Sequence, residues 1–480
     1  MPLTITGIVA TLVGLILLCR YGLARSILHP FPHVCLQYVL FFGTFSTNEE
    51  LKHSVDLACL LAFVTFSAAL LIGDSLVSNR VARASLANAW PASPLSAIIE
   101  RMRTKHIAYL VCWIAFVLCI YTFVFSLEFG GLASSLVRFY RGQPNEYSMN
   151  PWIRWAGRLL PFMLSSCLCC IAVLRVQYLA HKRCLTKRLS VLGVVFYLLL
   201  VIPIGSAGLV FACGMTILLA NVAVSVKKHS RVVFRPETFL MLLCAVALAG
   251  VLQSIRSVRF DSPRDAYDHV LQSDVTLLQD SSANIVRSHS MLPDWVAICL
   301  QKFGTDKQFL WFYTPYTLAV SFIPRQFWPA KPAGFGKILA TPTLDPDQAT
   351  ELARKRVGAS FAAGLAGEGY ANGGYVGVIA LSLVLGLSCG IACKYAVVGM
   401  LSGNMIHFII GLYCRQIPPM FVRGDVLSAF GAAVYPLVFM LAVLWVYRHV
   451  WPRHRRSQIQ YRPFVLAKRH TGSAKNIVCR

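Results

Sequence analysis

The chain alternates between long apolar blocks and short polar segments. Most of the apolar blocks are close to the roughly 20 residues that an α-helix needs to cross the hydrocarbon core of a bilayer. Block length predicts about eleven membrane-spanning helices, at residues 5–19, 31–47, 55–76, 107–128, 159–179, 189–204, 206–226, 236–253, 374–394, 400–417 and 426–450.

Composition supports an all-α, polytopic integral membrane protein. Hydrophobic residues make up 56% of the 480 residues and charged residues only 14%. Soluble domains carry roughly 25% charged residues. The polar segment 254–373 divides the chain into an eight-helix membrane region (1–253), a large loop (254–373), a three-helix membrane region (374–450) and a basic tail (451–480).

The basic residues predict how these helices are oriented. Four short segments, 80–105, 175–188, 227–235 and 451–480, are rich in Lys and Arg and hold one acidic residue between them, Glu100. With eleven spans all four segments fall on one side of the membrane, which the positive-inside tendency makes the cytoplasm. The net charge of +25 then reflects orientation, and nucleic acid is not an expected partner. The N-terminus and the loop 254–373 are predicted to be periplasmic, and the C-terminal tail cytoplasmic.

The loop 254–373 differs in kind from the other connections. It holds twelve Lys or Arg and eleven of the chain's 20 acidic residues, together with several Trp, Tyr and Phe. Loops of this length are uncommon unless they are functional or disordered, and the aromatic content disfavours disorder. The apolar stretch 309–323 inside it is predicted to be a re-entrant or interfacial helix, since no second crossing is available before residue 374.

No motif in the sequence predicts a metal or a cofactor. Nucleotide-binding Gly-rich loops, paired zinc-ligand spacings and a hydrolase nucleophile elbow are all missing. Asp345-Pro346-Asp347 matches the metal-binding pattern of nucleotide-sugar enzymes, but its prolines and predicted exterior position favour a turn. The scattered cysteines support neither a disulfide framework nor a metal site.

Cations at the exterior membrane surface are the main chemical candidates. In the segment 322–332, three prolines favour a rigid, non-helical conformation that holds Arg325 and Lys331 near the headgroups. Arg and Lys suit phosphate oxygens, so the segment predicts a pyrophosphate clamp, with an ordinary interfacial anchor as the alternative. Arg256 and Arg259, at the start of the loop, are further candidate substrate-binding cations.

Two further segments contain candidate site residues. The Gly-rich segment 364–375 places Glu368 and Asn372 at the membrane boundary, where Glu368 is either a general base or an ordinary ion-pair partner. The segment 415–425 between the last two spans contains Arg415, within the predicted end of the tenth span, and Arg423 and Asp425 in the predicted exterior turn. Charges at membrane depth are costly and suggest function, which makes Arg415 a candidate for substrate binding. For Arg423 and Asp425 the alternative is a pair across the turn.

These motifs resemble those of the Wzy-type O-antigen polymerases, which join oligosaccharide repeat units. The resemblance rests on Ile-Pro-Arg325, Trp-Pro-x-Lys331-Pro, the stretch Gly-Glu368-x-Tyr-x-Asn372-x-Gly and Arg423-Gly-Asp, and covers roughly 253–430. It implies a GT-C-like, metal-independent glycosyltransferase of the bacterial inner membrane. Its implied partners are an undecaprenyl-pyrophosphate-linked oligosaccharide, the bilayer and a chain-length regulator. It also implies catalytic roles for Glu368, Arg325 and Arg423.

Other functions stay open at this point. An O-antigen ligase would use the same donor but transfer the finished glycan to lipid A-core. A flippase or transporter would favour internal repeats, and none is seen in the sequence. A non-catalytic assembly or sensor component is compatible with the charge-rich loop.

Overall fold

A computed structural model gives the architecture of the chain. It describes residues 4–42, 49–89, 104–129, 151–181, 184–204, 207–229, 239–241, 243–244, 247–248, 292–323, 327–341, 343–355, 361–402, 404–423, 425–427, 429–431 and 438. These residues are almost all helical and form no strand, only an isolated bridge between Phe303 and Lys307. The predicted all-α class is confirmed for this part of the chain.

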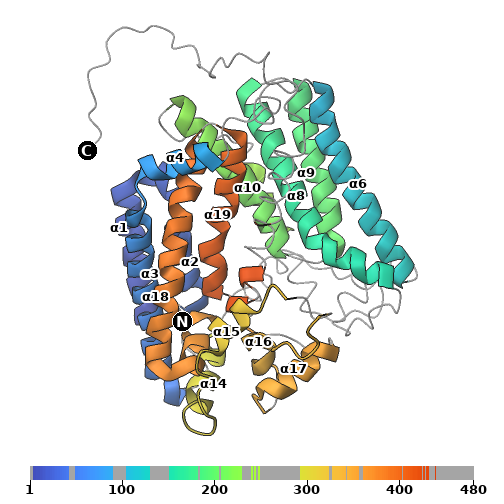
Figure 1. Cartoon of the computed structure of the whole chain (residues 1–480). Coiled ribbons are helices and arrows are strands. Elements are labelled where there is room, and N and C mark those ends of the chain that lie inside the picture. The colour runs from blue at the N-terminus through green and yellow to red at the C-terminus, as the bar shows by residue number, and fades with distance from the viewer. Residues whose placement is uncertain are drawn as a thin grey trace, which may run out of the picture. The chain divides into compact units, whose positions relative to one another are not determined.

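Figure 1 labels the α-helices with numbers that increase along the chain. Four short helices lie in the region predicted to be the large loop. Their bounds are α1 (Ile5–Leu28), α2 (Phe31–Phe42), η1 (Glu49–Leu51), α3 (Lys52–Leu76), α4 (Asn79–Ala89), α6 (Thr104–Phe129), α8 (Pro151–His181), α9 (Cys184–Ile204), α10 (Ala207–His229), α14 (Leu292–Lys302), α15 (Tyr313–Ala319), α16 (Phe335–Leu339), α17 (Pro346–Lys355), α18 (Gly364–Leu401) and α19 (Met405–Arg423).

Within the described residues, three helical stretches are long and apolar enough to cross a membrane: α3, Leu209–Val226 of α10, and α18. Shorter apolar helical stretches occupy Ile5–Cys19, Phe31–Phe42, Ala108–Thr122 and Met163–Leu179. Large apolar side chains are exposed along α1, α3, α6 and α18. Such a surface needs an apolar environment, as a membrane protein would have.

Helices α3 and α18 pack closely because glycines line their contact (Figure 1). A methyl group added at Gly390 would lie 2.1 Å from the Leu70 carbonyl oxygen, and one at Gly386 would lie 2.6 Å from that of Phe66. Small residues permit this kind of approach between membrane helices. The contacts advance in the same direction along both chains, so α3 and α18 run parallel.

Two hydrophobic clusters hold the helices together. One joins residues of α1, α2, α3, α14, α18 and α19, and the other joins α6, α8, α9 and α10. The first cluster also receives a polar anchor, because the Asp56 carboxylate accepts the backbone N–H groups of Ile5 and Thr6 at the start of α1. A carboxylate at a helix N-terminus satisfies donors that have no partner within the helix.

Several predicted boundaries are wrong. The tenth predicted span was expected to end at 417, but α19 continues through Pro418 and Pro419 to Arg423. The helix predicted over 309–323 is confined to the seven residues of α15. The basic segment 80–105 begins with α4, a helix that was not predicted. Most of the predicted spans 236–253 and 426–450 lies outside the described residues.

Candidate functional site

Helix α18 is broken near its start by two glycines. Gly374 has φ 63° and ψ −151°, and Gly373 is extended at φ 170°. A positive φ favours glycine, which explains the glycine at position 374. The break separates the short helical segment 364–372 from the apolar run that follows it. The rings of Trp311 and Phe309 pack against the two glycines and bring the start of α15 to this point.

Three polar side chains form a buried network at this end of α18. The Thr314 hydroxyl donates to Glu368 Oε1 at 2.7 Å and accepts from Asn372 Nδ2 at 2.8 Å. Asn372 Oδ1 accepts the Thr314 backbone N–H at 3.0 Å, and Asn372 Nδ2 also donates to the Glu368 carbonyl at 2.8 Å. The network therefore fixes α15 to α18 through side chains that are almost fully buried.

Glu368 also holds the segment that follows α19. Its Oε2 accepts the backbone N–H of Val426 at 2.8 Å, and this residue comes directly after Arg423-Gly-Asp425. A methyl group added at Gly364 would lie 2.7 Å from the Val422 carbonyl oxygen, so the end of α19 also touches the first residue of α18. The Gly-rich motif and the Arg-Gly-Asp motif are thus brought together, although about 55 residues separate them in the chain.

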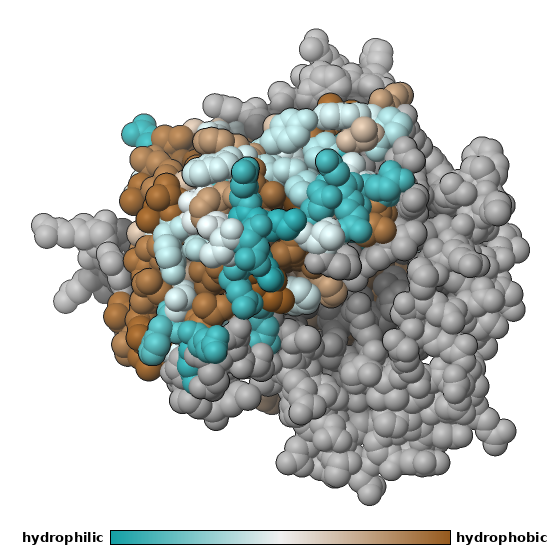
Figure 2. Space-filling model, turned by 90° about the horizontal axis from the view of Figure 1, so that it is seen from below, coloured by the Kyte–Doolittle hydropathy of each residue, from teal (hydrophilic) through white to brown (hydrophobic). Residues whose placement is uncertain are grey.

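The two residues that follow the proline-rich motif, Ala333 and Gly334, reach the same place. Tyr313 donates its phenolic hydrogen to the Ala333 carbonyl at 2.9 Å. A methyl group added at Gly334 would lie 3.5 Å from Asp425 Oδ1 and 3.0 Å from Leu427. Residues within or directly next to each of the three motifs therefore surround the network of Glu368, Thr314 and Asn372, which we call the loop-end cluster. Figure 2 shows the loop side of the molecule, where hydrophilic residues gather and hydrophobic ones border them.

The environment of Glu368 favours its protonated form. Glu368 lies before the break in α18, outside the apolar run that could cross a membrane, and is only 1% exposed. Burial, with the negative charge of Asp425 as a second cause, raises the pKa of Glu368 to about 8, although the hydrogen bonds from Thr314 and Val426 act in the opposite direction. A carboxyl group so enclosed orients the chain segments that donate to it.

The other predicted site residues have different placements. Lys331 donates to the carbonyls of Ser321 at 2.7 Å and Ile323 at 2.9 Å, so its ammonium closes the turn 321–331. Arg325, Arg256 and Arg259 lie outside the described residues, as does the side chain of Arg423, whose backbone ends α19.

Arg415 lies within its helix, as predicted, but farther from the helix end, because α19 continues to Arg423. It is buried within α19, and its Nε and Nη2 donate to the Ile27 carbonyl at 3.2 and 3.0 Å. Its Nη1 lies 3.5 Å from His33 Nδ1. The last carbonyls of a helix have no partner within it, so Arg415 satisfies one at the end of α1. The structure therefore gives Arg415 a helix-packing geometry.

Sequence reasoning missed Thr314 and the Val426 amide as partners of Glu368. Thr314 is a polar residue in a mainly apolar and aromatic stretch, which was a usable signal. The backbone donor of Val426 carries no signal in the side-chain pattern. Within the described part of the chain, no group of three or more His, Cys, Asp or Glu is placed to hold a metal ion.

Comparisons of the chain with protein-family models, curated proteins and solved structures find no match. The resemblance of the motifs to the O-antigen polymerases therefore stays a prediction, and the roles of the residues depend on the geometry described above.

Proposed function

We propose that the protein is a polymerase of lipid-linked oligosaccharides, acting at the loop end of a bacterial inner-membrane domain. One observation carries the proposal: chain segments that contain or directly adjoin the polymerase-like motifs, far apart in the chain, meet around the buried side chain of Glu368. In this proposal the loop end faces the periplasm, the N-terminus lies on the same side, and the C-terminal tail is cytoplasmic.

The reaction would be a glycosyl transfer from a polyprenyl pyrophosphate. A hydroxyl oxygen of the acceptor repeat unit attacks the anomeric carbon of the donor glycan, and the bond from that carbon to the pyrophosphate oxygen breaks. The pyrophosphate leaves with the bonding electrons, and the hydroxyl proton passes to a base. The periplasm supplies no nucleoside triphosphate, so a donor already activated as a lipid pyrophosphate suits this location.

Arg423 and Arg325 are the proposed partners of the leaving group. Negative charge develops on the pyrophosphate as the glycosidic bond breaks, and fixed guanidinium groups stabilise it without a metal. Glu368 is assigned a positioning role. By accepting the Val426 amide and the Thr314 hydroxyl, it fixes the turn that follows Arg423 against α15. Asn372 is assigned the same role, because it ties Thr314 to α18.

The test compares glycan length in cells that carry single variants. Arg423→Ala and Arg325→Ala should each abolish long chains and leave single repeat units on the lipid carrier. Lys302→Ala is the matched control, because Lys302 is an exposed loop cation whose ion pair with Asp306 is 2.8 Å long and remote from the motifs in sequence. Its glycan ladder should be normal.

Two outcomes would reject the proposal. Normal ladders from both arginine variants would remove the site assignment. Accumulation of fully polymerised but untransferred glycan in a strain that lacks the protein would identify a ligase instead.

A further inference from the structure

A cavity lies at the opposite end of α3 and α18 from the loop-end cluster. Its volume is about 720 Å³. Residues of α3, α4 and α18 and of the turn between α18 and α19 form most of its wall, and the wall combines polar and basic groups with a strip of apolar ones. The lining consists of His29, Asp74, Asn79, Arg83, Leu86, Ala87, Lys394, Val397, Val398, Leu401, Ser402, Asn404 and His407.

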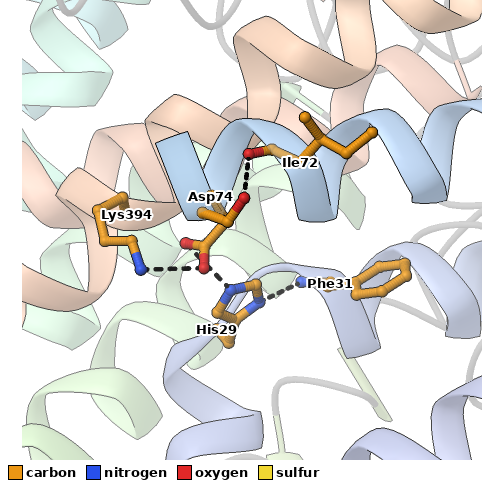
Figure 3. Close-up of polar contacts among 6 residues, drawn as sticks. His29, Phe31, Ile72, Asp74 and Lys394 are labelled. Atoms are coloured by element: carbon orange, nitrogen blue, oxygen red, sulfur yellow. Dashed lines mark hydrogen bonds and ion pairs between the residues drawn. The ribbon is translucent and has the colours of Figure 1, made fainter. Parts of the chain in front are cut away.

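The carboxylate in this wall is already matched by basic partners (Figure 3). Lys394 Nζ donates to Asp74 Oδ2 at 3.0 Å, and His29 Nε2 lies 3.7 Å from Asp74 Oδ1. The backbone N–H of Phe31 donates to His29 Nδ1 at 3.2 Å, so the proton of a neutral His29 is on Nε2, facing Asp74. Asp74 therefore does not leave the cavity negatively charged.

The remaining polar groups make the cavity suitable for an anion. With Asp74 paired to Lys394, the guanidinium of Arg83 adds a positive charge to the wall. Lys394 has three ammonium hydrogens, of which the bond to Asp74 uses one. Asn79 and Asn404 contribute side-chain amide N–H groups that can donate to phosphate oxygens, whereas the Ser402 hydroxyl donates to the Gly399 carbonyl.

Helix α4 and the end of α18 combine these donors with apolar surface. Ala82 and Leu86 of α4 are buried, whereas Arg80, Val81 and Arg83 are exposed. This division is typical of a helix that lies along a membrane surface. Val397, Val398 and Leu401 form an apolar strip beside the basic groups. A ligand that carries both a phosphate and hydrocarbon would contact both parts.

The length of α18 places the cavity at a membrane surface. The run from Tyr375 to Lys394 is roughly 30 Å long at about 1.5 Å per residue, which equals the thickness of the hydrocarbon core. If the break in α18 lies at one surface, Lys394 and Arg83 lie at the level of the phosphate groups at the other. Basic groups close to a membrane surface attract anionic lipids.

We propose that this cavity binds the phosphate headgroup of an anionic phospholipid, with Arg83 and Lys394 contacting the phosphate and the strip of Val397, Val398 and Leu401 contacting the upper acyl chain. This site is independent of the proposed glycosyl transfer, since it lies at the other end of α18 and shares no residue with the loop-end cluster.

The test is a thermal-shift titration of the purified full-length protein in neutral detergent. Adding phosphatidylglycerol should raise the melting temperature in a saturable way, whereas phosphatidylcholine should not. Arg83→Gln should weaken the apparent affinity for phosphatidylglycerol about tenfold. Arg80→Gln is the matched control, because Arg80 is an exposed arginine of the same helix that is not part of the cavity wall. It should leave the affinity within about twofold.

A second variant and a second anion distinguish a specific lipid site from non-specific surface attraction and from a site for free phosphate. The double substitution Asp74→Asn with Lys394→Gln removes both partners, leaves no lone buried charge, and should also weaken lipid affinity. Equal losses for Arg80→Gln and Arg83→Gln would show non-specific surface attraction and overturn the proposal. If inorganic phosphate alone gave the full shift, the cavity would be a free-phosphate site, and the lipid assignment would be wrong.

Discussion

A carboxylate lies near each end of α18: Glu368 of α18 itself near its start, and Asp74 of α3 near its other end. The two carboxylates have different hydrogen-bond partners. At the loop end, neutral donors surround Glu368: the Thr314 hydroxyl and the Val426 amide. At the other end Asp74 is bonded by the Lys394 ammonium and lies next to His29, beside a cavity. Glu368 is fully enclosed, whereas the Asp74 and Lys394 side chains keep 20% and 17% of their surface exposed.

This difference indicates that Glu368 positions chain segments, whereas Asp74 belongs to a proposed binding site. A carboxylate enclosed by neutral donors fixes the elements that supply them, and its own charge is disfavoured. A carboxylate paired with cations at the edge of a cavity sets the charge of that cavity. Glu368 therefore organises the motifs of the loop end, and Asp74 holds Lys394 where a ligand can meet it. The variants below test this comparison.

The largest loss of stability is expected at the contact between α3 and α18, because both the loop-end cluster and the cavity depend on it. Gly390→Ala would place a methyl group 2.1 Å from the Leu70 carbonyl oxygen, so α3 and α18 must separate. The free energy of unfolding should fall by more than about 4 kcal/mol. The atom nearest to the new methyl group belongs to the backbone of α3, which cannot move aside as a flexible side chain would. Thermal unfolding in detergent measures it. Gly14→Ala is the control, since its added methyl would lie 3.4 Å from Cys35, an ordinary contact. Equal stability of the two variants would contradict the close packing.

A smaller loss is expected from breaking the charge pair. Lys394→Met leaves Asp74 without its cation and should cost about 3 kcal/mol, the low end for a buried pair, because both side chains are partly exposed. Adding Asp74→Asn to the same chain should restore most of that stability. Unfolding of the single and double variants measures the coupling. A double variant as unstable as the single one would mean that the pair is not the cause.

The pH dependence of stability distinguishes the two carboxylates further. The pKa of Glu368 is raised to about 8 in the folded protein. Protonated Glu368 therefore stabilises the fold fully below its ordinary pKa of about 4.3, and this stabilisation is lost as the pH rises through 8. Stability should fall by about 2 kcal/mol between pH 6 and pH 8 from this group. In Glu368→Gln this component should vanish, and a pH profile unchanged by the substitution would refute it.

The smallest effect is expected at Lys331. Its ammonium donates to two carbonyls at a partly exposed turn, so Lys331→Met should cost about 1 kcal/mol. If Lys331 only closes this turn, glycan chains of the variant should keep their normal length on a gel. A loss of long chains with no loss of stability would return Lys331 to the role of a pyrophosphate ligand.

The sequence predicted the helical class and apolar spans within α3 and α18. Periodicity and block length carry that information because they reflect burial along one element. The sequence also selected Glu368 as catalytic and Asn372 as substrate-binding, and those two roles stay predictions. Apolar length predicted that the tenth span ends at 417, yet α19 continues through Pro418 and Pro419, since neighbouring helices can satisfy groups that proline leaves unpaired. Arg415 therefore lies inside α19 and not at the end of its helix, against Ile27.

The partners of Glu368 could not be predicted for a different reason. They depend on contacts between segments more than 50 residues apart, and one of them is a backbone amide. Helix α4 was not predicted because its basic residues were interpreted only as a signal of membrane orientation. The apolar positions Ala82 and Leu86 between them were therefore not recognised as the buried face of a helix.

The side of the membrane on which the loop-end cluster lies is the most direct test of the central claim. Thr343→Cys places an exposed thiol in the loop, and Ser402→Cys places one at the cavity end. Spheroplasts treated with a membrane-impermeant maleimide should label Thr343→Cys above the level of the unsubstituted protein, and Ser402→Cys only after permeabilisation. The reverse pattern would place the loop in the cytoplasm, where the proposed lipid-linked polymerisation cannot occur.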